Sequence, residues 1–237
     1  MRNLLLAAVA VMALGSVSAA NASSTLYYGG DLDPNNPNVN GLANENDGIV
    51  NGAATYDNFT VSGGTWHVTG LFTNDLSGLN VTSADWEIRS GVSEGNGGTL
   101  LFSGSSLSPV VTATGRGAFG FNEFNVEVPV SLNLAPGEYW LSVVPVSGDA
   151  NRSFESNTFG LNAIGVHTAK SDYWNSAFFG ANFTNANNEG VFPGFSSGVI
   201  GTAGAVPEPS TWTLLLVSFA GLGAALRMRR STALAQA

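Results

Sequence analysis

Three oxygen-bearing side chains in the first part of the chain stand at alternate positions. Asp31, Asp33 and Asn35 each offer a carboxylate or amide oxygen, which is the ligand type that Ca²⁺ prefers. An EF-hand loop would carry Gly and Glu at its sixth and twelfth positions, where this chain has Asn36 and Leu42. A calcium site at Asp31, Asp33 and Asn35 is one expectation. An Asx turn, in which the side chains bond to their own backbone, is the favoured alternative.

Residues suited to catalysis are scarce. The two histidines are His67, in a predicted strand, and His167, in a predicted loop. We expect both at the surface or between strands rather than as general bases, and neither has a third ligand at a zinc-site spacing. Asp85 and Glu87 share a predicted strand face and could form a glycosidase pair, but a solvated strand face is the favoured interpretation. We therefore expect no enzyme.

Aromatic residues gather in a polar segment late in the domain. Tyr173 and Trp174 lie there, followed by Phe178 and Phe179. Exposed aromatic rings form the platforms on which glycan-binding β-sandwiches hold sugars, so Tyr173 and Trp174 are candidate carbohydrate contacts. Burial in the core is the alternative, because large aromatic side chains are more often buried.

The C-terminal segment combines three features in a fixed order. Pro207 and Pro209 flank Glu208 and hold the backbone extended, as a protease requires of the strand that it binds. Fifteen uncharged residues, 212–226, follow and predict a helix about 22 Å long, shorter than the roughly 30 Å hydrocarbon core of a bilayer. A basic cluster after the helix should hold that end in the cytoplasm; it consists of Arg227, Arg229 and Arg230.

The opposite end of the chain predicts export. Residues 1–22 contain a basic start at Arg2, an apolar stretch and small residues before two possible cleavage points, after Ala20 or after Ala22. This order is typical of a secretory signal peptide. The apolar stretch is too short to span a membrane.

The proline motif, apolar helix and arginine cluster resemble the PEP-CTERM sorting signal of Gram-negative bacteria. The resemblance implies that Pro207, Glu208 and Pro209 are recognised by an exosortase, a membrane-embedded transpeptidase of bacteria that make exopolysaccharide. It also implies a route for the chain. The chain would be exported, held transiently in the inner membrane by its helix, cut near the motif, and released or attached at the cell surface or in the extracellular matrix.

Charge and cysteine content exclude several classes of protein. Residues 23–206 carry four basic and sixteen acidic side chains, a formal net charge of −12. Such a domain should repel nucleic acid and anionic lipid, so we expect no nucleic-acid partner. The chain has no cysteine, which removes thiol catalysis and cysteine-based metal sites and leaves apolar burial to stabilise the fold.

Periodicity divides the exported region into two parts. Residues 23–55 are rich in Asn, Asp, Gly and Pro without a period, which predicts a lead-in loop. Residues 56–206 contain short runs with period two between Gly-rich turns, as in 84–90 and 124–130. This pattern predicts one all-β domain over 56–206, an antiparallel two-sheet sandwich of jelly-roll type. The sorting tail, with a single transmembrane helix, then occupies 207–237.

Taken together, these features predict an exported protein of the cell surface or extracellular matrix without catalytic activity. A carbohydrate-binding module that acts on exopolysaccharide is the alternative. The expected partners are the exosortase, the membrane before processing, and exopolysaccharide in the alternative. Apart from calcium, no cofactor is expected.

Overall fold

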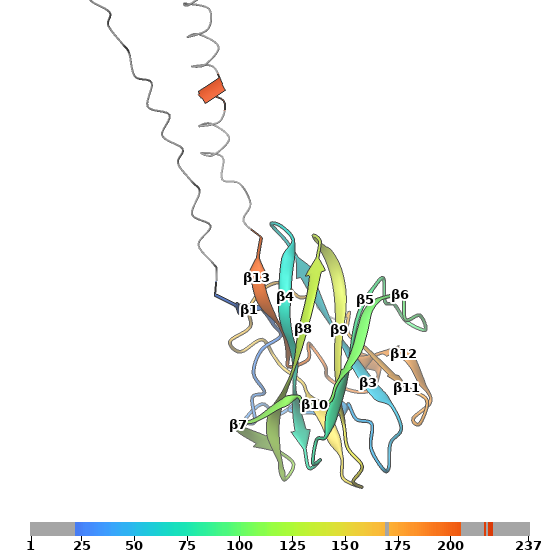
Figure 1. The fold of residues 1–237 in the computed structure, drawn as a ribbon. Helices are drawn as coiled ribbons and strands as arrows, with labels where there is room; N and C mark the ends of the chain where they lie inside the picture. The colour runs from blue at the N-terminus through green and yellow to red at the C-terminus, as the bar shows by residue number, and fades with distance from the viewer. Residues whose placement is uncertain (1–21, 169–170, 205–215, 217, 220–237) are drawn as a thin grey trace, which may run out of the picture.

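The computed structural model describes residues 22–168, 171–204, 216 and 218–219, and the domain that they form is all-β (Figure 1). Thirteen strands build two sheets in which neighbouring strands run antiparallel. One short 3-10 helix, η1 (Ala186–Asn188), precedes the last strand. The predicted all-β fold with two antiparallel sheets is confirmed.

The first sheet is built around β4, the strand with the most partners. One edge of β4 pairs with β8, and β8 pairs with β7. Along the other edge β4 pairs first with β13 and then with β10, which are flanked by β1 and β2. The bounds of these strands are β1 (Ser24–Tyr28), β2 (Gly41–Ala43), β4 (Trp66–Ser77), β7 (Val110–Ala118), β8 (Phe121–Leu134), β10 (Ser153–Ser156) and β13 (Ser197–Ala203).

The second sheet has the order β12-β11-β3-β9-β5-β6. Its centre is formed by β3 and β9, which bring together segments about eighty residues apart in the chain. The bounds of its strands are β3 (Ala53–Val61), β5 (Ser83–Ser90), β6 (Thr99–Ser106), β9 (Gly137–Val146), β11 (Tyr173–Ser176) and β12 (Ala181–Asn185).

An apolar core joins the two sheets. The period-two alternation of β8 is visible in it, because Val126 and Val128 are fully buried while Glu127 between them keeps some exposure. Phe59 of β3 stacks on Tyr27 of β1 with ring centroids 5.3 Å apart, so the contact crosses from one sheet to the other. A single cluster contains side chains of both sheets, among them Val68, Leu71, Val126, Val128, Ile88, Leu141 and Val143.

The prediction of a lead-in loop over residues 23–55 is wrong where strands form. β1, β2 and the start of β3 lie inside it. Their partners are β13, β10 and β11, which come from the far half of the chain. Because local periodicity reports only on neighbours in sequence, these pairings left no pattern to recognise. The sheet domain therefore begins at Ser24 rather than at residue 56.

Both ends of the domain leave it at the same place. Ser24 at the start of β1 pairs with Gly201 near the end of β13, and the two strands lie side by side at the edge of the first sheet (Figure 1). The start of β1 and the end of β13 therefore lie at the same end of the first sheet.

Several predicted features fall outside the described residues. These are the signal peptide up to residue 21, which includes Ala20, and most of the sorting tail with its proline motif and basic cluster. Ala22 is the first described residue and belongs to no strand. Within the described part of the chain, we find no helix of sufficient length and apolarity to cross a membrane.

Replacing Phe59 by alanine tests the core between the sheets. Phe59 is fully buried, and Phe→Ala in a core costs about 3–5 kcal/mol of unfolding free energy. Leu107→Ala is the matched control, because this side chain is 82% exposed and should change stability by no more than about 0.5 kcal/mol. Urea denaturation of both variants measures the difference. Equal losses would contradict the assigned core.

Candidate functional site

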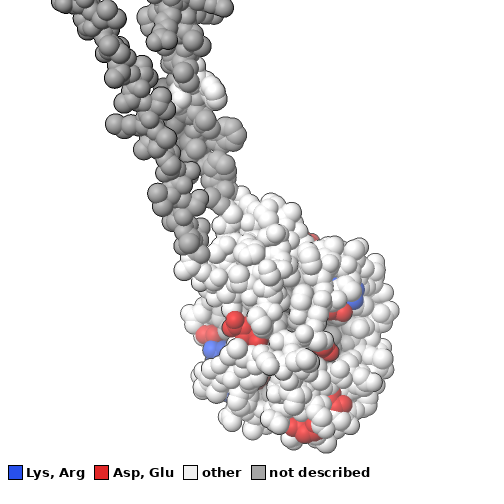
Figure 2. Space-filling model, viewed as in Figure 1, with Lys and Arg blue, Asp and Glu red and all other residues white. Residues whose placement is uncertain are grey.

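The acidic residues of this domain are unevenly exposed. Figure 2 shows a face that is mostly uncharged, with scattered acidic atoms and basic atoms lying beside them. The three arginines of the described domain each form an ion pair with a carboxylate. Six of the sixteen acids in residues 23–206 are buried, namely Glu45, Asp57, Asp75, Glu123, Glu155 and Asp172. These buried acids are therefore the candidates for a functional site.

Asp57, His167 and Asp172, here called the Asp57 cluster, come from two segments, β3 and the loop between β10 and β11. Asp57 lies on β3, and Asp172 directly precedes β11. Because Tyr173 of β11 pairs with Tyr56 of β3, the two aspartates are brought to neighbouring strands. His167 lies in the loop between β10 and β11, and its side chain lies close to both aspartates.

Two hydrogen bonds to β3 fix the loop on either side of His167. The backbone N–H of Thr60 donates to the carbonyl of Val166 at 3.0 Å, an ordinary hydrogen-bond distance. On the other side, the N–H of Thr168 donates to Asn58 Oδ1 at 2.8 Å. The imidazole is therefore held over β3 by contacts with its neighbours in sequence.

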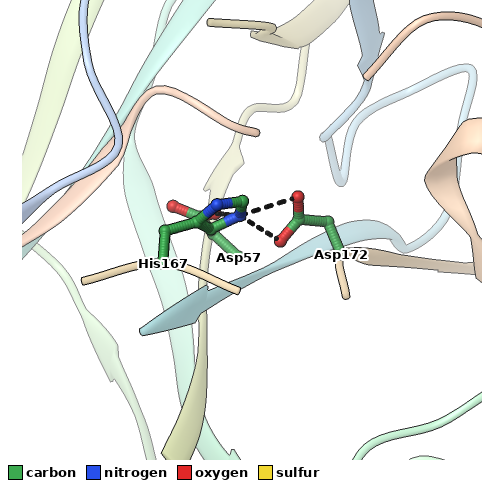
Figure 3. Close-up of side chains that lie close together, drawn as sticks. All are labelled: Asp57, His167 and Asp172. Carbon is green, nitrogen blue, oxygen red and sulfur yellow. Dashed lines mark hydrogen bonds and ion pairs between the residues drawn. The ribbon is translucent and has the colours of Figure 1, made fainter. Parts of the chain in front are cut away.

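The three side chains point toward one another (Figure 3). His167 Nε2 lies 3.1 Å from each carboxylate oxygen of Asp172 and 3.8 Å from Asp57 Oδ1. Both aspartates are fully buried, while the His167 side chain keeps 20% of its surface exposed. Asp172 Oδ1 also accepts a hydrogen bond from the backbone N–H of Asn58 at 3.1 Å.

The second oxygen of Asp57 ties the cluster to the opposite sheet. Asp57 Oδ2 accepts hydrogen bonds from the Tyr27 hydroxyl at 2.9 Å and from Ser197 Oγ at 2.6 Å. Tyr27 lies on β1 and Ser197 on β13. Asp57 Oδ1, in contrast, is buried without a hydrogen-bond partner in the described structure.

Burial dominates the electrostatics of the Asp57 cluster. Burial, and then repulsion by Asp172, raise the pKa of Asp57 to about 8. Burial also raises the pKa of Asp172, against the opposing effect of His167. Burial lowers the pKa of His167, but its hydrogen bond to Asp172 and the nearby negative charges outweigh burial and raise that pKa to about 9. Without a bound cation, the cluster therefore retains protons at neutral pH.

A hollow gives His167 access to solvent. It has a volume of about 220 Å³. Its wall is formed mainly by small residues, among them Gly29, Thr158 and Gly194, and includes His167. The imidazole thus lies between this hollow and the two enclosed carboxylates.

A second pair of buried acids, Asp75 and Glu155, lies in the first sheet. The two residues stand directly opposite each other on β4 and β10. Asp75 Oδ1 accepts a hydrogen bond from Asn44 Nδ2 at 3.1 Å, and Glu155 Oε2 accepts one from the Thr55 hydroxyl. Asp75 Oδ2 and Glu155 Oε1 are buried without a hydrogen-bond partner among the described residues. Like charges in directly opposed positions destabilise a sheet.

The pKa values of this pair rise for the same reasons. Burial raises the pKa of Asp75 to about 8. Burial, followed by the charge of Asp75, raises the pKa of Glu155 well above its usual range. The pair therefore keeps a proton in the folded chain at neutral pH, where an unfolded chain would lose it.

The residues predicted as a calcium site are engaged within the chain. Asp31 Oδ1 lies 2.7 Å from Arg116 Nη1 and accepts a hydrogen bond from the Tyr28 hydroxyl at 2.6 Å. Asp33 Oδ1 accepts the backbone N–H of Asn35 at 3.0 Å, which is the Asx-turn contact. Calcium binding at Asp31, Asp33 and Asn35 stays a prediction.

Trp174 does not have the exposure that the predicted carbohydrate contact requires. It is buried in a cluster with Phe192 and Phe195, and its Nε1 donates to the carbonyl of Ala43 at 2.8 Å. Tyr173, on the other face of β11, is half-buried against a small cluster around Trp140. The strand alternation sends Trp174 inward, which corrects its assignment to an exposed platform.

The histidines differ in their surroundings. His67 is exposed on β4, with Nδ1 3.0 Å from Asn133 Oδ1, as predicted. His167 lies in a loop, as predicted, with 20% of its side chain exposed, and it joins the Asp57 cluster through carboxylates 110 residues before it and five residues after it. The short spacing between His167 and Asp172 was the signal available in the sequence, and it matches no standard motif.

A Gly-x-Ser-x-Gly sequence, the pattern of a hydrolase nucleophile elbow, lies near the cluster at residues 194–198. Its serines bond to groups other than the imidazole. Ser196 Oγ donates to the carbonyl of Gly30 at 2.7 Å, and Ser197 Oγ donates to Asp57 as described above. A triad would instead require a serine hydroxyl bonded to the histidine.

Comparison with known proteins identifies the tail. Residues 205–230 match the family model described as the PEP-CTERM protein-sorting motif. Neither a curated protein nor a solved structure matches the chain. The match confirms the resemblance inferred from the proline motif, helix and basic cluster.

Stability should fall as pH rises. The folded pKa of Asp75 lies above its ordinary value, so the folded chain binds more protons than the unfolded chain between about pH 4 and pH 8, and the stabilisation is lost as pH rises through this window. We expect the Tm of the full chain at pH 8.5 to be at least about 5 °C below that at pH 5, since 1 kcal/mol corresponds to about 2–4 °C at this size. Circular dichroism melts measure it.

Asp75→Asn separates this pair from other titrating groups. An amide cannot ionise and can donate to Glu155, so the variant should gain Tm at pH 8.5 and show a smaller pH effect. Glu189→Gln, at an exposed position, is the control and should behave as the wild type. An unchanged pH effect in Asp75→Asn would contradict the assignment.

Proposed function

We propose that this chain, an exported protein that carries a PEP-CTERM sorting motif and is sorted through an exosortase, acts as a non-catalytic component of the cell surface or extracellular matrix. The pairing of Ser24 with Gly201 is the observation that carries the proposal. It places the end of β13, after which the sorting motif follows in the sequence, at the same end of the domain as the start of β1. The remaining surface is then free to face away from the site of processing.

The enclosure of the Asp57 cluster supports a role without catalysis. Asp57 and Asp172 have no exposed surface, so a substrate has no place beside either carboxylate. Acid–base catalysis requires the acting group within hydrogen-bond reach of the substrate. The other buried carboxylates of Glu45 and Glu123 are held by Arg152 and Arg116.

Processing would proceed from both ends. The signal peptide, residues 1–22, would direct export and be removed after Ala20 or Ala22. The helix at 212–226 would then hold the chain in the inner membrane, with the basic cluster on the cytoplasmic side. Pro207, Glu208 and Pro209 would present an extended strand to the exosortase, and cleavage near them would release the domain to the surface or matrix.

Mass spectrometry of the chain recovered from its host tests this route. We expect a mature C-terminus near Pro209 and loss of the apolar segment. The double variant Pro207→Ala/Pro209→Ala should keep an intact tail in the membrane fraction, because the backbone is no longer held extended. Pro34→Ala/Pro37→Ala, in an exposed loop, is the control. An intact tail in the wild type would show a plain membrane anchor instead.

Exopolysaccharide binding is a second proposal, and one observation favours it. Phe178 and Phe179 are 56% and 44% exposed, with ring centroids 4.9 Å apart in an edge-to-face arrangement. Two adjoining exposed rings in the turn between β11 and β12 offer the apolar surface on which a sugar can stack. The platform would therefore lie at Phe178 and Phe179, next to the predicted Tyr173 and Trp174.

Phe178→Ala should lower affinity for the host's exopolysaccharide about tenfold, equivalent to about 1.4 kcal/mol, without changing Tm. Calorimetric titration with the purified polysaccharide measures it. Phe119→Ala, at a separate exposed ring, is the control and should bind as the wild type. Unaltered affinity in Phe178→Ala would rule out this platform.

A further inference from the structure

The Asp57 cluster has the dimensions of a metal site. One atom from each of Asp57, His167 and Asp172 lies within 4.8 Å of the others. The His167 Nε2 atom is 3.1 Å from Asp172 Oδ2 and 3.8 Å from Asp57 Oδ1. A tetrahedral zinc site with bonds of about 2.0–2.2 Å places its ligand atoms roughly 3.3–3.6 Å apart. Small adjustments of these side chains would therefore close the site around an ion.

An unpaired oxygen points to a missing ligand. Asp57 Oδ1 is fully buried and has no hydrogen-bond partner among the described residues, although the other oxygen of the same carboxylate has two. Leaving a buried carboxylate oxygen unpaired costs free energy, and such groups in proteins are usually paired or bound to metal. Figure 3 shows the Asp57 carboxylate beside the His167 ring.

The surrounding hydrogen bonds have the pattern of an outer coordination shell. Tyr27 and Ser197 hold Asp57 by Oδ2, and Oδ1 has no hydrogen bond and lies 3.8 Å from His167 Nε2. The N–H of Asn58 holds Asp172 by Oδ1. Outer contacts of this kind orient ligating carboxylates in known metal sites. They come from β1, β13 and β3, so the site would rest on rigid strands.

The ligand set selects the class of ion. One imidazole nitrogen and two carboxylate oxygens suit borderline divalent transition metals such as Zn²⁺, whereas Ca²⁺ and Mg²⁺ prefer all-oxygen sites. Two ionised aspartates would neutralise the charge of such an ion. The arginines of the domain do not neutralise these aspartates, because Arg89, Arg116 and Arg152 are paired with other acids.

The hollow beside His167 provides a route for the ion and room for a water ligand. A side-chain carbon added at Gly194 would lie 3.7 Å from His167 Nε2, so glycine at this position keeps the approach open. Zinc sites commonly complete four coordination with water when the protein supplies three ligands.

We propose that Asp57, His167 and Asp172 bind one divalent transition-metal ion of the Zn²⁺ class, which ties the loop between β10 and β11 to β3. Its carboxylate ligands are enclosed, and the hydrogen bonds from Tyr27 and Ser197 to Asp57 connect the site to β1 and β13. This proposal is independent of how the chain is processed or what it binds outside.

Titration of the full chain with Zn²⁺ tests the proposal. The chain is first treated with chelator, and binding is then followed by calorimetry and by thermal melts. We expect one Zn²⁺ per chain and a Tm increase of about 5–10 °C when free Zn²⁺ exceeds Kd a hundredfold. Mg²⁺ and Ca²⁺ at the same concentration should leave Tm nearly unchanged. Stabilisation by Ca²⁺ without stabilisation by Zn²⁺ would overturn the proposal.

The two histidines allow a matched pair of variants. His167→Gln should lose Zn²⁺ binding and the Tm increase, whereas His67→Gln, at the exposed position, should keep both. Asp57→Asn is a second test, and its metal-free melt and circular dichroism spectrum establish that it folds. Retained binding in a folded His167→Gln, or loss of binding in His67→Gln, would place the ion elsewhere and contradict the assignment.

Discussion

The burial of carboxylates between the two sheets is the constraint on which the rest of this structure depends. Enclosed acids must be ion-paired, protonated or bound to a cation, because an isolated buried charge is too costly to keep. Glu45 and Glu123 are matched by arginines. The Asp57 cluster and the pair of Asp75 and Glu155 have no such cation, apart from the partly exposed His167. Their protons or a bound ion must therefore be part of the folded state.

This constraint divides the interior into an apolar and a polar part. Phe59 and its neighbours hold the sheets together by burial alone, while β1, β13 and the loop carrying His167 are joined through Asp57. The same two strands, β1 and β13, bring the ends of the domain together. The polar network thus contacts the same two strands that form the ends of the described domain.

Local patterns predicted some of these features and not others. The sorting motif depends on the order of residues in one short segment, so it was readable directly. Alternation predicted β8 because Val126 and Val128 repeat every second residue. β1 and β2 were missed because their pairing partners lie in the far half of the chain. Asp57 and His167 meet across 110 residues, and no spacing in a single sequence reports that contact.

The metal-free folded chain should hold protons on its buried acids at neutral pH. The most direct measurement is the number of protons released when the metal-free chain unfolds at pH 6.5, from calorimetry in buffers of different ionisation enthalpy. Because the raised pKa values of Asp75 and Glu155 leave the folded chain with more bound protons than the unfolded chain, we predict release of at least about one proton per chain. Proton uptake, or no exchange, would contradict the account.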